Sequence, residues 1–181
     1  MGIASPEFVI ISPVNKALIV IDVQKYFLNE ETKPIVKKIQ KYLKEKASKY
    51  IAVYFTIFKN DSSSPLWKIS EWKDCADFPD IDSCDEIKEF ANSKNTYYKN
   101  ILSALKVPQL RKGLRKHNIS EVDLCGFDTD CCVLATAYDL FDEGIKPVVL
   151  GNLTWSTSKE RLHKPALQMV ERNIGFVVRV K

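Results

Sequence analysis

The chain has 181 residues, of which 45% are hydrophobic and 28% charged, and its net charge is +4. This length fits a single domain that buries its core without metals or disulfides, and the composition is that of an ordinary globular protein. The small positive charge comes from lysines scattered along the chain, so it predicts neither a nucleic-acid partner nor a membrane surface. No apolar run approaches the roughly 20 residues of a membrane-spanning helix.

The cysteine and histidine content argues against disulfides and metal sites. An odd number of cysteines, two of them adjacent, does not resemble a disulfide framework, and the two histidines, His117 and His163, are not spaced for zinc. We therefore expect no metal and no cofactor, and a reducing cytoplasmic location. The five cysteines are Cys75, Cys84, Cys125, Cys131 and Cys132.

The N-terminus lacks the features of a secretory signal. Residues 1–8 resemble a vector-derived tail, and residues 9–181 are expected to form one domain.

The first half of the chain predicts two strands and a helix. Residues 16–22 are a nearly continuous apolar run, typical of a parallel strand that is buried on both faces. Residues 30–48 have apolar side chains at helical spacing among lysines, and residues 50–58 are rich in β-branched and aromatic side chains that favour a strand. The long irregular stretch 59–85 is a candidate cover for an active site.

The second half continues the alternation of helix and strand. Alternation of this kind predicts an α/β fold with three layers (α/β/α), Rossmann-like, around a parallel sheet of about six strands. The expected helices are 86–91, 101–114 with an interruption near Pro108, 133–143 and 158–173, and the expected strands are 96–98, 122–127, 145–150 and 176–180.

Three reactive side chains follow different strands of this predicted sheet. Ligands of such sheets bind beyond the carboxyl ends of the strands. Asp22 and Gln24 end the first strand, Lys99 ends the third, and Cys132 lies where the fourth gives way to a helix. An acid, a cation and a thiol are therefore expected at one edge.

These residue types suit nucleophilic catalysis. A helix N-terminus and an ammonium both favour the reactive thiolate, and an aspartate can accept the thiol proton and return it to a leaving amine. Inert packing of Cys132, a capping role for Asp22 and surface exposure of Lys99 are the competing interpretations.

At these residues the chain resembles the isochorismatase-like cysteine hydrolase family. The resemblance extends to the C-terminus, and its blocks occur in the family's order. They are 17–24 with Phe27, 99–105, 126–137 and 156–163.

The resemblance implies the isochorismatase-like hydrolase fold and an Asp22, Lys99, Cys132 triad. By that analogy, Cys132 attacks an amide-type carbonyl and forms an acyl-enzyme, Asp22 activates the hydrolytic water, and Lys99 supports the charge on sulfur. A cis peptide is implied between Phe127 and Asp128, with an oxyanion hole made by the backbone N–H groups of Asp128 and Cys132. The family pattern selects Cys132 over Cys131 as the nucleophile.

The sequence also departs from the family pattern. No Asp-x-His metal motif follows the second strand, which disfavours a zinc- or iron-dependent nicotinamidase. Asp128 replaces a small apolar residue, and this carboxylate is expected either to alter substrate choice or to oppose thiolate formation. Asn152 stands where an acid is common.

The expected substrate is a small amide, carbamoyl or ureido compound. Vinyl-ether hydrolysis of an isochorismate-like compound, and a catalytically silent interaction protein on the same scaffold, stay open as alternatives. We expect a homo-oligomer, a dimer or tetramer. Candidate substrate-binding residues are Gln24, Phe27, Phe127, Trp67, Trp72 and Tyr138.

Overall fold

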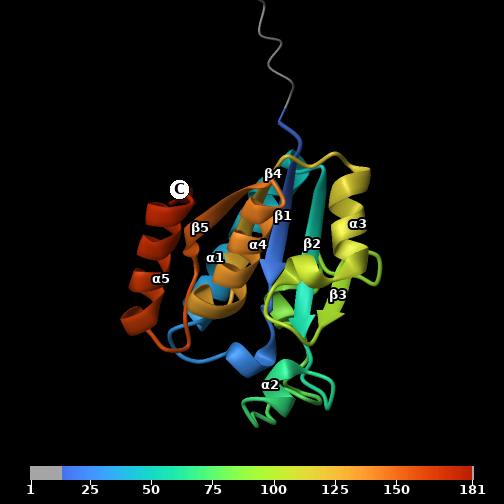
Figure 1. Cartoon of the computed structure of the whole chain (residues 1–181), viewed down its shortest axis with the longest axis vertical. Helices are drawn as coiled ribbons and strands as arrows, with labels where there is room; N and C mark the ends of the chain where they lie inside the picture. The colour runs from blue at the N-terminus through green and yellow to red at the C-terminus, as the bar shows by residue number, and fades with distance from the viewer. Residues whose placement is uncertain (1–13, 181) are drawn as a thin grey trace, which may run out of the picture.

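The computed structural model describes residues 14–180 and contains one six-stranded sheet in which every pairing is parallel. The predicted three-layer α/β/α fold is confirmed (Figure 1). The strand order is β3-β2-β1-β4-β5-β6. The strands are β1 (Lys16–Ile21), β2 (Ala52–Phe58), β3 (Thr96–Lys99), β4 (Glu121–Gly126), β5 (Lys146–Thr154) and β6 (Val177–Val178). The expected tail over residues 1–8 lies outside the described residues.

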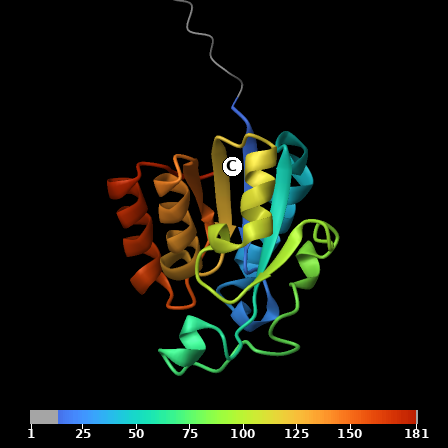
Figure 2. The same ribbon diagram turned by 45° about the vertical axis from the view of Figure 1, so that its right-hand side comes forward.

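Helices cover both faces of the sheet. The α-helices of the described residues are α1 (Lys33–Lys46), α2 (Pro65–Lys68), α3 (Pro108–Lys116), α4 (Leu134–Asp142) and α5 (Glu160–Asn173). Helix α1 packs on one face, and α3, α4 and α5 pack on the other (Figures 1 and 2). Within residues 14–180, none of the helices is long and apolar enough to cross a membrane.

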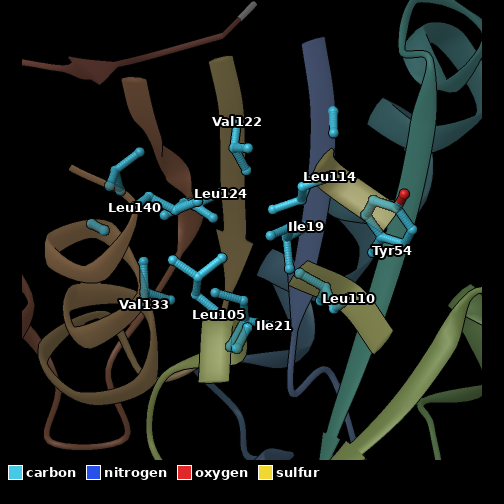
Figure 3. Packing of buried hydrophobic residues seen from close by; sticks show 14 of the residues in the cluster. Ile19, Ile21, Tyr54, Leu105, Leu110, Leu114, Val122, Leu124, Val133 and Leu140 are labelled. Carbon is cyan, nitrogen blue, oxygen red and sulfur yellow. The ribbon is translucent and has the colours of Figure 1, made fainter. Parts of the chain in front are cut away.

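The core follows from the two-residue period of the buried strands. Ile19 and Ile21 of β1 point to the face covered by α3 and α4, where they join Leu110, Leu114 and Leu140 (Figure 3). The alternate β1 residues, such as Leu18 and Val20, pack under α1. Because β1 is buried on both faces, its sequence is a continuous apolar run rather than an alternating one.

Several predicted boundaries shift. Pro108 does not interrupt a helix; it begins α3, because a proline at the first helical position loses no hydrogen bond. Strand β5 extends four residues beyond the predicted end, to Thr154. The predicted helix over 86–91 is a single 3₁₀ turn, Asp85–Ile87. The predicted helix over 133–143 is preceded by a π-helical turn, Thr129–Val133.

The long stretch between β2 and the 3₁₀ turn at Asp85 contains only the short helix α2. It lies beyond the carboxyl ends of the strands (Figure 1). This is the edge at which the sequence places Asp22, Lys99 and Cys132.

Gly126, the last residue of β4, is required by close contact with β1. Its φ is +111°, and a Cβ built on it would lie 2.0 Å from the Ile21 carbonyl oxygen. That oxygen also accepts a hydrogen bond from the Phe127 N–H at 2.8 Å. A glycine therefore lets β4 end against β1, which sets the start of the turn that carries Cys132.

We expect Gly126→Ala to lower the free energy of unfolding by more than about 3 kcal/mol, because the new methyl group collides with backbone. Gly144→Ala is the matched control. Gly144 also has a positive φ, +75°, but no atom lies within 4 Å of the position that a Cβ would occupy there, so the cost is about 1–2 kcal/mol. Urea unfolding of both variants measures the difference. Equal losses would contradict the proposed backbone collision.

Candidate active site

Asp22 follows β1 and is held by the neighbouring strand β2. It is fully buried, and its φ is +51°. Its N–H donates to the Thr56 carbonyl at 3.1 Å, and its Oδ1 accepts from the Thr56 hydroxyl at 2.7 Å. The carboxylate is therefore fixed through one oxygen, which leaves Oδ2 directed at a second partner.

That partner is Lys99, the last residue of β3. Its Nζ lies 2.7 Å from Asp22 Oδ2, and it donates to the Ile101 carbonyl at 3.1 Å and to the Cys132 Sγ at 3.3 Å. These three contacts match the three protons of an ammonium. Burial lowers the pKa of Lys99, but the Asp22 carboxylate and the contact with Cys132 outweigh burial and raise that pKa. Lys99 is therefore a buried, permanently charged ammonium.

Cys132 occupies the π-helical turn that precedes α4. It is 5% exposed. Its carbonyl accepts a hydrogen bond from the Thr136 hydroxyl at 2.7 Å, which ties the turn to the helix. The structure thus brings Asp22, Lys99 and Cys132 together from the ends of β1, β3 and β4.

The turn around Asp128 provides a backbone donor. The Phe127–Asp128 peptide bond is cis, as the resemblance implies. The Asp128 carbonyl accepts from the N–H groups of Cys131 and Val133, both at 3.1 Å, whereas the N–H of Asp128 donates to no other residue of 14–180. This N–H is available to stabilise an oxyanion above Cys132.

The neighbours of the Cys132 thiol shift its pKa in opposite directions. The hydrogen bond with Cys131, burial and the charge of Asp22 raise the pKa of the Cys132 thiol well above its ordinary value, and the Lys99 ammonium only partly offsets them. The same hydrogen bond lowers the pKa of Cys131. An attack by Cys132 on a carbonyl would therefore be helped by a base that takes the thiol proton.

A cavity of about 240 Å³ opens over the two thiols. Its wall is mainly aromatic and aliphatic, formed by Tyr26, Phe27, Phe58, Leu66, Trp72 and Leu102. Its polar lining consists of Asp128, Thr157, Cys131 and Cys132. Because Leu66 and Trp72 come from the long stretch after β2, that segment forms part of the cover over the site.

Two of the six candidate substrate contacts, Phe27 and Trp72, lie in this wall. The prediction for Gln24 is corrected, because its side chain is fully buried and already paired. Its amide N–H group donates to the Phe58 carbonyl at 2.9 Å and to the Cys75 sulfur at 3.1 Å, and its oxygen accepts from the Phe58 N–H at 2.8 Å. Gln24 therefore connects β1 to the cover segment.

Phe127, Trp67 and Tyr138, also predicted as substrate contacts, do not line this cavity. Phe127 is fully buried in the core beneath α1, since the strand end directs its ring away from the cavity. Trp67 packs against Lys73, whose Nζ lies 4.5 Å from the ring centroid. Tyr138, on α4, lines a separate groove, and its hydroxyl accepts from the Asn173 amide at 2.6 Å.

The sequence reasoning singled out the Asp128 carboxylate but did not find its partner Thr157. Asp128 Oδ1 accepts from the Thr157 N–H at 2.9 Å, and Oδ2 accepts from the Thr157 hydroxyl at 2.5 Å. Burial raises the pKa of Asp128 to about 6, although the bonds to Thr157 lower it. Only the unusual residue type of Asp128 signalled this feature, because Thr157 approaches it from the loop after β5.

The structure shows no metal centre in the part of the chain that it describes. No group of three or more His, Cys, Asp or Glu side chains within residues 14–180 could hold a metal ion. Asp61, which lies just after β2, instead accepts from the Ser63 N–H at 2.7 Å. The Nδ1 atom of His163 lies 2.8 Å from the Thr129 hydroxyl, outside the cavity lining.

Comparison with known proteins identifies the family. The family model described as "Isochorismatase domain" matches residues 16–181. The chain therefore belongs to the isochorismatase family, and it is a hydrolase of that family.

Three relatives illustrate the similarity. An isochorismatase family protein PncA of Bacillus subtilis (strain 168), described as uncharacterized, is 37% identical over 86 residues. That match covers 46% of each chain, so it spans about half of this curated relative. The crystal structure of nicotinamidase PncA from Bacillus subtilis superimposes with a TM-score of 0.79 at 25% identity, over 92% of this chain and 100% of that one. N-carbamoylsarcosine amidase from Thermoplasma acidophilum gives a TM-score of 0.77 at 21% identity, over 92% and 96%.

Asp128 is expected to destabilise the folded protein at neutral pH. Its pKa in the fold, about 6, lies above the ordinary 3.8. The fold favours the protonated form of Asp128. The stability that this preference contributes is therefore complete below about pH 4, and it is lost as the pH rises through about 6. We expect Asp128→Asn to raise the free energy of unfolding by about 1–2 kcal/mol at pH 8 and by much less at pH 5, as measured by urea unfolding.

Asp61→Asn is the control of opposite sign. Hydrogen bonds from Ser63 lower the pKa of Asp61, so its contribution to stability is present at high pH and lost as the pH falls. Asp61→Asn is expected to cost more stability at pH 8 than at low pH. An Asp128→Asn variant no more stable than the parent at pH 8 would contradict the assigned cost of burying the Asp128 charge.

Proposed function

We propose that this protein is a cysteine hydrolase that cleaves a C–N bond of a small amide, carbamoyl or ureido compound through an acyl-enzyme on Cys132. The observation that carries the proposal is the buried Lys99 ammonium, which contacts both Asp22, at 2.7 Å, and the Cys132 sulfur, at 3.3 Å. A fully buried cation between a carboxylate and a thiol is costly to desolvate and is typical of a functional site.

In the acylation step, Asp22 accepts the Cys132 proton as the sulfur attacks the substrate carbonyl carbon. The new C–S bond forms as the carbonyl electron pair moves to oxygen, and the Asp128 and Cys132 N–H groups stabilise that oxyanion. Asp22 then gives its proton to the departing nitrogen, the C–N bond breaks, and a thioester on Cys132 remains. The raised pKa of the thiol makes this proton acceptor necessary.

In the deacylation step, water replaces the departed amine or ammonia. Asp22 takes a proton from water as the oxygen attacks the thioester carbon. The tetrahedral intermediate collapses, the C–S bond breaks, and the proton returns to the sulfur. Lys99 stays protonated throughout and offsets the negative charge as it moves between Asp22 and Cys132.

The cavity and the relatives support a small C–N substrate. A volume of about 240 Å³ with an apolar wall suits a small molecule rather than a peptide chain. Two structural relatives are named nicotinamidase and N-carbamoylsarcosine amidase. The thiol beside Lys99 favours acyl transfer over vinyl-ether hydrolysis, which needs no cysteine nucleophile. A triad whose cysteine lines a cavity also favours an enzyme over a silent interaction protein.

We also propose a reducing compartment such as the cytoplasm, which is supported by the five cysteines, all of them free thiols within the described residues. The homo-oligomer expected from the resemblance stays a prediction.

We expect Cys132→Ala to reduce turnover at least about 10³-fold, because no other group can form the thioester. Cys131→Ala, the matched control on the same turn, should retain activity within about tenfold, since Cys131 does not contact Lys99. Amine or ammonia release from a panel of small amides measures both variants, and mass spectrometry of quenched parent enzyme detects the acyl adduct. Unchanged turnover by Cys132→Ala would eliminate the proposed nucleophile.

Asp22→Asn should lower kcat by about 10²–10⁴-fold, because it keeps the shape of the side chain but loses the proton acceptor. Thr56→Val removes the hydroxyl that donates to Asp22 Oδ1 and leaves the carboxylate in place, so its loss in kcat should be smaller, about tenfold. The iodoacetamide labelling rate of Cys132 across pH supplies a second measurement. Equal kcat for Asp22→Asn and the parent would show that Asp22 is not the base.

A further inference from the structure

The Asp128 carboxylate is a charged group of the cavity for which the proposed mechanism has no use. The mechanism uses the backbone N–H of Asp128, but not its side chain. The carboxylate lines the cavity together with Cys132. Within residues 14–180 it forms no ion pair with a lysine, arginine or histidine, in contrast to Asp22 and Asp82. The negative charge is therefore built into the cavity without an internal cation.

Thr157 fixes the orientation of this carboxylate without neutralising it. Each oxygen accepts one hydrogen bond from Thr157, from the N–H at 2.9 Å or from the hydroxyl at 2.5 Å. Because each carboxylate oxygen has two acceptor positions, one on each oxygen is left for another donor. The side chain is thus a preorganised acceptor beside the nucleophile.

The aromatic wall of the cavity also suits a ligand that carries a positive charge. Tyr26 packs edge-on against both Phe27 and Trp72, with ring centroids 5.1 and 5.6 Å apart. Aromatic faces attract cations and accommodate the methylene groups of an alkylammonium. The Lys99 ammonium is not part of the cavity lining, and its charge is paired with the Asp22 carboxylate at 2.7 Å, so its repulsion of a bound cation is compensated.

We propose that Asp128 is a specificity-determining residue that binds a cationic nitrogen, an ammonium or a guanidinium, of a substrate whose scissile C–N bond lies over Cys132. This inference rests on the proposed function and names the substrate class of the same site. The carboxylate pairs with the cation, and the wall around Tyr26 and Trp72 packs against the carbon chain between the cation and the carbonyl.

The cost of burying Asp128 supports a functional role. Its raised pKa means that the empty site disfavours the carboxylate charge, and a bound cation relieves this penalty. A purely structural role, holding the loop at Thr157, predicts that an isosteric amide would serve almost as well. A variant that removes the charge of Asp128 but keeps the shape of its side chain therefore distinguishes the two roles.

The test measures binding in the Cys132→Ala background, where no turnover is needed. The probes are ω-aminoalkanamides of two to six carbons, each paired with the unsubstituted alkanamide of equal length, titrated by calorimetry at pH 8. We expect the best amino amide to bind at least about tenfold more tightly than its neutral partner. Adding Asp128→Asn should reduce this preference to less than about twofold, and adding Asp130→Asn, a charge-matched control on the same turn, should preserve it.

The inference would be overturned by no measurable binding of any amino amide, by equal binding of the paired probes, or by a preference that survives Asp128→Asn. A preference lost equally in Asp130→Asn would also overturn it. That result would mean that the summed negative charge of the turn, rather than a contact with Asp128, attracts the cation. Failure of the proposed function is separate, since it would appear as unchanged turnover in Cys132→Ala whatever the binding preference.

Discussion

The placement of one buried ammonium governs the architecture of this site. The Lys99 side chain has no exposed surface, and its three contacts are the Asp22 carboxylate, the Ile101 carbonyl and the Cys132 sulfur. A charge removed from water in this way is tolerated only when every proton has an acceptor. The ends of β1 and β3 and the turn before α4 must therefore keep their relative positions, because each of them supplies one partner or the ammonium itself.

The strand order explains why a lysine suits this position. In the order β3-β2-β1-β4, Lys99 on β3 must reach across β2 to Asp22 on β1. That distance is about two strand spacings, roughly 9–10 Å, and it requires a long side chain together with the reach of the carboxylate. Phe58 of β2 lies beneath, with its ring centroid 5.0 Å from Lys99 Nζ, so the ammonium lies over an aromatic ring.

The two carboxylates of the site differ in how their charges are compensated. Asp22 is paired with an internal cation and anchored by Thr56, whereas Asp128 faces the cavity and is anchored only by the neutral Thr157. Charge compensation of the first is complete in the folded protein. The second has no internal cation among the described residues, and its cost in stability is consistent with the binding role that we propose for it.

The sequence by itself determined the alternation of strands and helices, the parallel sheet and the edge at which Asp22, Lys99 and Cys132 meet, because hydrophobic period and strand ends are local properties of the chain. Only the tertiary structure decided which neighbours each side chain faces. Gln24 and Asp22 both follow β1. The Gln24 side chain hydrogen-bonds to the backbone of β2, whereas the Asp22 carboxylate faces Lys99. Likewise, Phe127 turned into the core while Tyr26 and Phe58 entered the cavity wall. The contact between Asp128 and Thr157 joins segments 29 residues apart, and no local pattern encodes such a distance, because it depends on how the loops after β4 and β5 pack together.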